Sequence, residues 1–167
     1  GALYVKKGTQ ILPRVFGGGQ ERGLRSGTES LPLIGAFAKA AELAPRPGEV
    51  LPRMEELHHM LWERLRAIPG VALNTPSEGL PYIVNFSALG VRAETMLHFL
   101  AQRDVYVSAG SACGKAAPSH VLAAMGLPKE RISSALRVSL SRFTAGEDVL
   151  ALREGVRTGL ATLAKER

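Results

Sequence analysis

The segment Pro45-Arg46-Pro47-Gly48 restricts the folds open to this chain of 167 residues more than any other feature. Two prolines and a glycine within four residues interrupt a helix or a strand, so the chain divides there into a short and a long part. We therefore expect residues 45–48 to be a linker between residues 1–44 and residues 49–167. The length suffices for one hydrophobic core, or for one core and part of another.

The N-terminal part is dominated by a glycine-rich stretch over residues 17–28, which contains five glycines and is predicted to be a loop without helix or strand. A short strand is expected at residues 2–5, with a turn at Lys6-Lys7-Gly8. Because the chain opens directly on this apolar strand, we expect it to be a fragment. A helix is expected over residues 31–43, with Ser30 as its N-cap.

The C-terminal part alternates helices with short strands. Apolar residues recur at helical spacing over residues 49–68. Strands are expected at residues 71–74, 82–88, 105–107 and 135–141, and further helices at about residues 92–103, 119–125 and 146–165. The last helix is preceded by a capping-box pattern, Thr144-Ala145-Gly146-Glu147. The sequence therefore predicts a mixed α/β fold, with a smaller α+β domain over residues 49–167.

Charge and composition argue against several classes of function. The formal net charge is +6, but the basic residues are scattered and aromatic residues make up only 5%, too few for base stacking. A site for a small anion is therefore favoured over nucleic-acid binding. No apolar run reaches the roughly 18 residues of a membrane span, and the first residues of the sequence do not show the pattern expected of a signal peptide. A single cysteine excludes an internal disulfide, no Cys/His cluster offers a zinc site, and the cytoplasm is the expected compartment.

The single cysteine, Cys113, lies among small residues in the sequence Ser108-Ala109-Gly110-Ser111-Ala112-Cys113-Gly114. A lone cysteine is commonly a small buried hydrophobic residue. This stretch, however, holds no large apolar residue to pack against a buried sulfur. Lys115 and His120 are close in sequence and would favour the thiolate, which is the nucleophilic form. From the residues alone, a reactive thiol and a core cysteine are both open.

Arg137 is a candidate carboxylate-binding residue. Strand alternation over residues 135–141 puts the apolar side chains of this strand on one face and Arg137 with two serines and an alanine on the other. A guanidinium on a serine-lined face suits bidentate binding of a carboxylate. A solvent-exposed arginine on a half-buried sheet fits the same pattern.

The glycine-rich stretch is a second candidate anion site. Its backbone N–H groups, the Thr28 hydroxyl and the side chains of Arg22 and Arg25 are all suited to an anion. Its spacing does not match the dinucleotide-binding fingerprint, and Gly110 to Ala116 does not match a P-loop. On the helix at residues 49–68, His58 and His59 are predicted to be surface or interface residues, because adjacent residues face different directions.

Three stretches of the sequence, Gly1–Val5, Gly17–Glu29 and Ser108–Cys113, resemble the cysteine desulfurases, which are class V, fold-type I enzymes that depend on pyridoxal 5'-phosphate (PLP). The stretches Ser119–Leu122 and Leu136–Thr144 extend the resemblance along most of the chain. The resemblance implies that residues 1–44 are the C-terminal remnant of a large PLP-binding domain. It also implies that residues 49–167 form the small domain.

The resemblance further implies roles for three residues. Cys113 matches the catalytic cysteine that takes the substrate sulfur as a persulfide, and Arg137 matches the arginine that binds the substrate carboxylate. Thr28 matches the threonine that reaches the PLP phosphate of the neighbouring subunit, which implies a homodimer. The implied substrate is L-cysteine, the product is L-alanine, and the implied partner is a sulfur acceptor such as an iron–sulfur scaffold.

The Schiff-base lysine of the family is expected a few residues before the Gly1–Val5 strand, outside this chain, so the chain alone is expected to be inactive. Lys6 and Lys7 follow that strand and do not match the lysine. Two alternatives remain. One is a sulfur-relay or binding module without the cofactor, in which Cys113 accepts a persulfide. The other is a related enzyme, such as a selenocysteine lyase or a sulfinate-releasing member.

Overall fold

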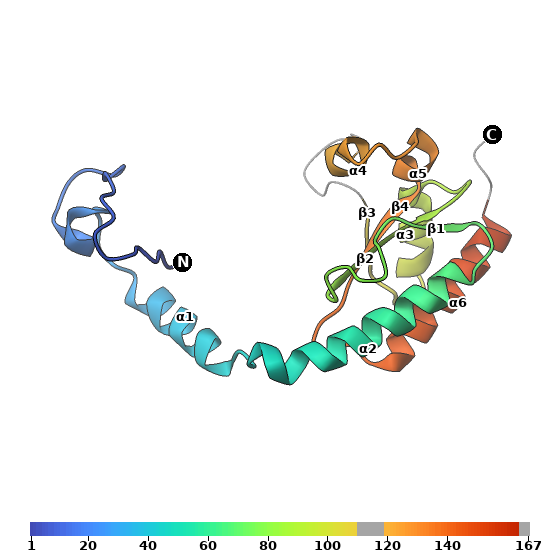
Figure 1. The fold of residues 1–167 in the computed structure, drawn as a ribbon, viewed down its shortest axis with the longest axis horizontal. Coiled ribbons are helices and arrows are strands. Elements are labelled where there is room, and N and C mark those ends of the chain that lie inside the picture. Colours follow the sequence, from blue (N-terminus) through green and yellow to red (C-terminus); the bar gives the residue numbers. More distant parts are fainter. Residues whose placement is uncertain (110–118, 164–167) are drawn as a thin grey trace. The chain divides into compact units, whose positions relative to one another are not determined.

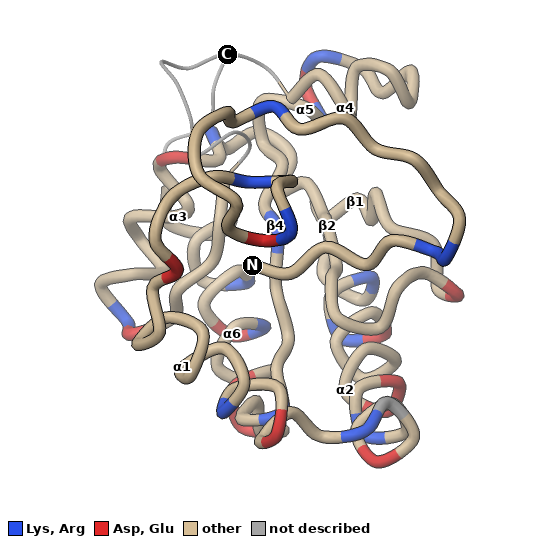
Figure 2. Tube along the Cα trace, turned by 90° about the vertical axis from the view of Figure 1, so that its left-hand side faces the viewer, with Lys and Arg blue, Asp and Glu red and all other residues tan. Residues whose placement is uncertain are grey.

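The computed structural model describes residues 1–109 and 119–163, and the chain divides into two compact units, residues 1–46 and 47–167 (Figure 1). The division falls inside the segment at residues 45–48. In the described part of both units, Lys and Arg residues are scattered along the chain, with Asp and Glu residues among them (Figure 2).

The first unit contains one α-helix, α1 (Leu31–Leu43), whose bounds agree with the prediction. Ser30 is the N-cap residue of this helix, as predicted, although its side chain makes no capping hydrogen bond. The predicted strand at residues 2–5 is wrong, because no strand among the described residues pairs with them to complete their backbone hydrogen bonds. The predicted turn is confirmed: Thr9 N–H donates to Lys6 O at 3.0 Å, and Gly8 has a φ of +89°.

The second unit is built on a four-stranded antiparallel sheet. Its strands are β1 (Val71–Leu73), β2 (Ile83–Ala88), β3 (Ser108–Ala109) and β4 (Ala135–Ser139), in the order β1-β2-β4-β3. Its long helices are α2 (Pro47–Arg66), α3 (Ala93–Ala101) and α6 (Gly146–Thr162), and its short ones are α4 (His120–Ala124) and α5 (Lys129–Ser133). Helices α2 and α3 contact the sheet, and α6 contacts both of them. The mixed α/β character predicted from the sequence is confirmed.

The core of the second unit lies between the inner face of the sheet and these helices. The helical repeat predicted for residues 49–68 is confirmed, because most apolar side chains of α2 at this spacing are fully buried and Leu51 is half-buried. The helix begins two residues earlier than predicted, since proline is accepted in a first turn, where its missing N–H is not needed. The largest fully buried side chains are Met54, Leu57, Leu61, Leu65, Phe86, Met96, Leu100 and Leu136.

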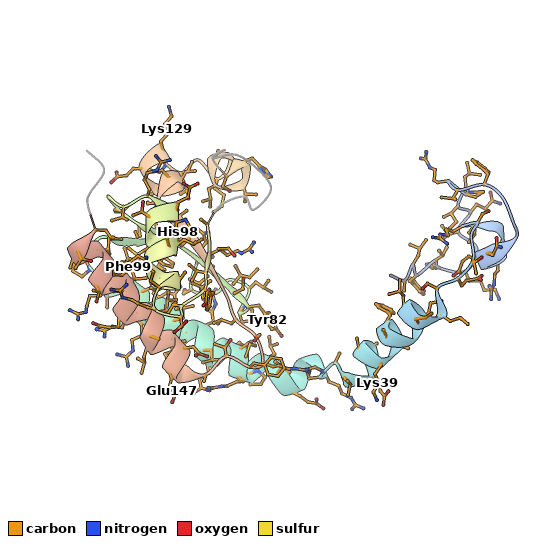
Figure 3. The ribbon with its side chains drawn as sticks, turned by 180° about the vertical axis from the view of Figure 1, so that it is seen from behind. Lys39, Tyr82, His98, Phe99, Lys129 and Glu147 are labelled. Carbon is orange, nitrogen blue, oxygen red and sulfur yellow. The ribbon has the colours of Figure 1, made fainter. Side chains whose placement is uncertain are left out.

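Strand β3 lies further along the chain than the strand predicted at residues 105–107. Its two residues pair with β4, as Ser108↔Arg137 and Ala109↔Leu136, whereas residues 105–107 have no strand opposite them. Helix α5, which begins at Lys129 (Figure 3), was not predicted, because five residues are too few to show a helical period.

Helix α6 begins at Gly146, but its cap differs from the predicted one. The N-cap is Ala145, whose N–H donates to the Asp148 carboxylate at 2.8 Å, so Asp148 and not Glu147 occupies the capping position. The Thr144 hydroxyl accepts instead from Ser141 N–H at 3.0 Å. Only the carboxylate half of a capping box is possible here, since alanine has no side-chain oxygen.

Two glycines of α6 allow a close approach to α3. A Cβ at Gly155 would lie 2.6 Å from Leu100 Cδ2, and one at Gly159 would lie 2.6 Å from Met96 Sδ. We expect Gly159→Val to lower the free energy of unfolding of the chain by about 1–3 kcal/mol, because the added methyl groups must displace packed side chains of α3. Urea denaturation followed by Trp62 fluorescence measures the change.

Ala161→Val is the matched control for this prediction. Ala161 is an exposed position on the same helix, so the two methyl groups that valine adds there are placed at the surface. We expect its effect on the free energy of unfolding to stay within about 0.5 kcal/mol. Equal stabilities of the two variants would contradict the close packing of α6 on α3.

Candidate functional site

Arg137 lies on the exposed outer face of β4, as strand alternation predicted. Its neighbours Leu136 and Val138 are buried on the inner face, whereas Arg137 and Ser139 are exposed. Within the described part of the chain, the Arg137 guanidinium has one long contact, from Nη2 to Ser108 Oγ at 3.5 Å. This contact is at the limit for a hydrogen bond, so the guanidinium retains its donors for an anionic ligand.

Ala135 shares the outer face with Arg137, as the alternation predicted, but it is buried there. Ala135 pairs with Ser87 of β2, and the Ser87 hydroxyl donates to Arg131 O of α5 at 2.7 Å. Helix α5 therefore covers this end of the outer face. The half of β4 that carries Arg137 and Ser139 is left open.

Arg137 is flanked by a polar residue on each neighbouring strand. The register places it opposite Ser108 on β3 and opposite Asn85 on β2. Because directly opposite residues point to the same face, the surroundings of the guanidinium are polar and uncharged. A cation among uncharged polar groups is suited to bind a small carboxylate.

Cys113 lies outside the described residues, so its role stays a prediction. The described chain stops at Ala109, the last residue of β3, and resumes at Ser119. The predicted helix after it is confirmed: Ser119 is the N-cap of α4, and its hydroxyl accepts from Leu122 N–H at 3.4 Å. Gly126, with a φ of +76°, follows the helix as predicted for a C-terminal stop.

A network of polar side chains, which the sequence analysis missed, attaches α5 to β1 and β2. Arg131 Nε donates to Asn74 Oδ1 at 2.9 Å, and Asn74 Nδ2 donates to Asn85 Oδ1 at 2.7 Å and to Ser87 Oγ at 2.9 Å. Arg131 Nη2 also donates to Leu73 O. Asn74 is 8% exposed. Buried polar groups need such partners, so the network holds its members in defined orientations.

The glycine-rich stretch is more ordered than a loop without secondary structure. It contains a short 3-10 helix, η1 (Gln20–Gly23), in which Glu21 and Arg22 have positive φ values of 50° and 59°. Gly27 N–H donates to Gln20 Oε1 at 3.2 Å, and the Ser26 hydroxyl donates to Gly18 O at 2.8 Å. The prediction that no helix forms here is therefore wrong, because these side-chain contacts close a turn that glycine content alone does not reveal.

Thr28 is exposed at the end of this stretch, and its hydroxyl makes no hydrogen bond within the residues that the structure describes. Gly27 before it has a φ of +113°, and a Cβ there would lie 3.1 Å from Arg25 Nη1. A free hydroxyl beside a glycine and a guanidinium is a donor set that suits a phosphate. Thr28 belongs to the first unit, and Arg137 belongs to the second.

His58 contradicts its prediction as a surface or interface residue. It is 3% exposed, and neither ring nitrogen has a hydrogen-bond partner within the described residues, whereas His59 is exposed. The reason lies in the spacing, because His58 follows Met54 by four residues and precedes Leu61 by three, which places it in the buried stripe of α2.

The described residues contain no group of His, Cys, Asp and Glu that could hold a metal ion. No helix among them is both long enough and apolar enough to cross a bilayer.

Comparison with known proteins gives a consistent result. Residues 1–152 match the aminotransferase class-V family. The chain is 42% identical over 153 residues to the cysteine desulfurase IscS of Methanosarcina thermophila, across 89% of this chain and 38% of that protein. It is 39% identical over 155 residues to the mitosomal cysteine desulfurase of Encephalitozoon cuniculi, across 89% of this chain and 35% of that protein.

Solved structures show the same relationship. A NifS-like protein has a TM-score of 0.82 at 34% identity, over 96% of this chain and 42% of that chain. A NifS-like protein from Rickettsia africae has a TM-score of 0.74 at 28% identity, over 93% of this chain and 41% of that chain. The chain spans about two fifths of the length of the curated relatives it matches. Since the family match includes most of both units, the chain belongs to the aminotransferase class-V family.

Proposed function

We propose that this chain is the C-terminal portion of a PLP-dependent cysteine desulfurase. In this proposal, residues 1–44 belong to the large cofactor-binding domain, and residues 49–167 are the small domain that carries the nucleophile. The proposal is supported by the similarity to the cysteine desulfurase IscS of Methanosarcina thermophila, which extends over 89% of this chain and 38% of that protein. The observation that carries it is the pairing of Ser108 with Arg137, because the strand that leads toward Cys113 then begins beside the carboxylate-binding guanidinium.

The residues of this chain fit one end of PLP. The exposed Thr28 hydroxyl and the nearby Arg25 guanidinium match the hydrogen-bonding needs of the PLP phosphate. The family resemblance assigns that phosphate to the neighbouring subunit, so the protein is a homodimer in this proposal. The Schiff-base lysine is assigned to sequence before residue 1. When bound, PLP supplies an electron sink for negative charge on a substrate carbon.

The residues of this chain then perform two tasks. Arg137 binds and orients the carboxylate of L-cysteine through paired N–H donors. The Cys113 thiolate attacks the substrate sulfur, so that a new S–S bond forms while the C–S bond breaks. The electron pair of that C–S bond remains on carbon, which takes up a proton. One L-cysteine and one Cys113 thiol thus become one L-alanine and one Cys113 persulfide, which is passed to an acceptor protein such as an iron–sulfur scaffold.

The full-length protein tests this proposal. With PLP and L-cysteine, and without an acceptor or reductant, we expect L-alanine and protein persulfide to appear in a one-to-one ratio per subunit in the first turnover. Amino-acid analysis measures the alanine, and mass spectrometry of the Cys113 peptide measures the added sulfur. Selenocysteine turnover without cysteine turnover would replace the proposal with a lyase function. No alanine from either substrate would overturn it.

A further inference from the structure

Asn85 lies beside Arg137 on the open face of the sheet. The two residues are direct partners in the pairing of β2 with β4, so their side chains share a face. Directly opposite residues in an antiparallel pair have Cβ atoms about 4.5–5.5 Å apart. Asn85 is half-buried, whereas Arg137 is exposed. Both side chains can therefore reach one small ligand above this face.

The hydrogen-bond network fixes which end of the Asn85 amide is in use. The Arg131 guanidinium can only donate, so the atom of Asn74 that it contacts must be the oxygen Oδ1. The other end of Asn74 is then the Nδ2 donor, and the atom of Asn85 that it contacts at 2.7 Å must be Oδ1. The NH₂ group of Asn85 remains, and it has no partner within the described residues.

The backbone of Asn85 is also held in place. Its N–H donates to Thr75 Oγ1 at 2.8 Å, and its carbonyl accepts from Asn74 N–H at 2.9 Å. A residue that only joined β1 to β2 would use the backbone groups and the side-chain oxygen, as Asn85 does. The NH₂ donor is the part that such a structural role leaves unused, and it lies on the face that carries the guanidinium.

We propose that the Asn85 NH₂ group is a second donor to the substrate carboxylate that Arg137 binds. Asn74 and Arg131 are positioning residues that orient this donor through the Asn85 oxygen. The inference rests on the proposed function, because it takes the ligand of Arg137 to be the carboxylate of an amino-acid substrate. A guanidinium and a fixed amide donor together specify the orientation of a carboxylate better than one side chain does.

Asn85→Asp tests the inference in the full-length, PLP-loaded protein. Aspartate keeps an oxygen for Asn74 Nδ2, but it replaces the NH₂ donor with a negatively charged oxygen that repels a carboxylate. We expect the KM for L-cysteine to rise about 10- to 100-fold, while kcat at saturating L-cysteine changes less than about threefold. Asn85→Ala removes the donor without adding charge, and we expect its KM to rise about three- to tenfold.

Gln102→Glu is the matched control, because it makes the same amide-to-carboxylate change at an exposed position at the end of α3. We expect it to leave KM unchanged. Thermal unfolding of each variant separates a binding effect from a loss of fold. A KM for Asn85→Asp within about twofold of the parent value, in a folded protein, would overturn the inference.

Asn74→Ala tests the positioning role. If Asn74 acts through Asn85, it raises KM in the parent protein but adds no further rise in the Asn85→Ala background, because coupled residues are not additive. A purely structural Asn74 would give the same additional loss in both backgrounds, which would overturn its positioning role.

Arg137→Ala, measured in the same series, distinguishes a failure of the Asn85 role from a failure of the proposed carboxylate site. If it raises KM at least tenfold and Asn85→Asp does not, the role of Asn85 is wrong and the proposed function stands. If neither variant changes KM, the carboxylate site itself is wrong, and the inference fails with it. A full-length protein that releases no alanine from L-cysteine overturns both.

Discussion

Replacing Cys113 with serine in the full-length, PLP-loaded protein is expected to abolish persulfide formation and to lower alanine release from L-cysteine at least about a thousandfold, as loss of a nucleophile commonly does. A serine hydroxyl is not ionised at neutral pH and cannot form the S–S bond that holds the transferred sulfur. Alanine analysis over time gives the rate, and mass spectrometry of the peptide that contains residue 113 detects the added sulfur.

The control for this prediction is substrate binding by the same variant. Cys113→Ser is expected to keep the change in PLP absorbance that L-cysteine causes, because Arg137 and Thr28 are intact. Turnover of L-cysteine at the parental rate would remove Cys113 from the mechanism. Loss of the absorbance change would point to a damaged site, and Cys113→Ala would then show whether the serine side chain is the cause.

Arg137→Ala is expected to raise the KM for L-cysteine about 100-fold, since two charge-assisted hydrogen bonds to the carboxylate are lost. Arg137 is exposed on β4, and within the described residues its side chain makes only one long contact, with Ser108, which indicates that the fold does not depend on this side chain. Steady-state kinetics of the full-length protein measure the change, and thermal unfolding checks the fold.

Arg137→Lys provides the comparison. Lysine keeps the positive charge but lacks the planar pair of donors, so we expect the KM of Arg137→Lys to be about tenfold lower than that of Arg137→Ala. If alanine and lysine at position 137 gave the same KM, charge at this position would not contribute to carboxylate binding. An unchanged KM for both would mean that the substrate carboxylate is bound elsewhere.

Features that depend on neighbours in sequence could be predicted. The bounds of α1 were correct because Pro32 and the following apolar repeat lie within the helix itself. The face of the strand on which Arg137 lies was predicted correctly, because strand alternation is a local property. The strand predicted at residues 2–5 failed because a strand requires a partner that sequence alone does not identify.

Features that depend on distant residues could not be predicted. The contact of Arg131 with Asn74 joins residues 57 positions apart, so no sequence pattern indicates that these two polar residues meet. The orientation of the Asn85 amide follows from that contact and was missed with it. The burial of His58 is different, because its spacing from Met54 and Leu61 was present in the sequence.

The strand order β1-β2-β4-β3 has a consequence for how the second unit forms during synthesis. Among the four described strands, β4 is the last in chain order and lies between β2 and β3, so β3 lacks its partner until residues 135–139 have emerged. The hairpin of β1 and β2 can form early, but the rest of the sheet waits for contacts between distant residues, which form slowly. The proposed carboxylate-binding face therefore forms in one late step, when the strand that carries Arg137 enters the sheet.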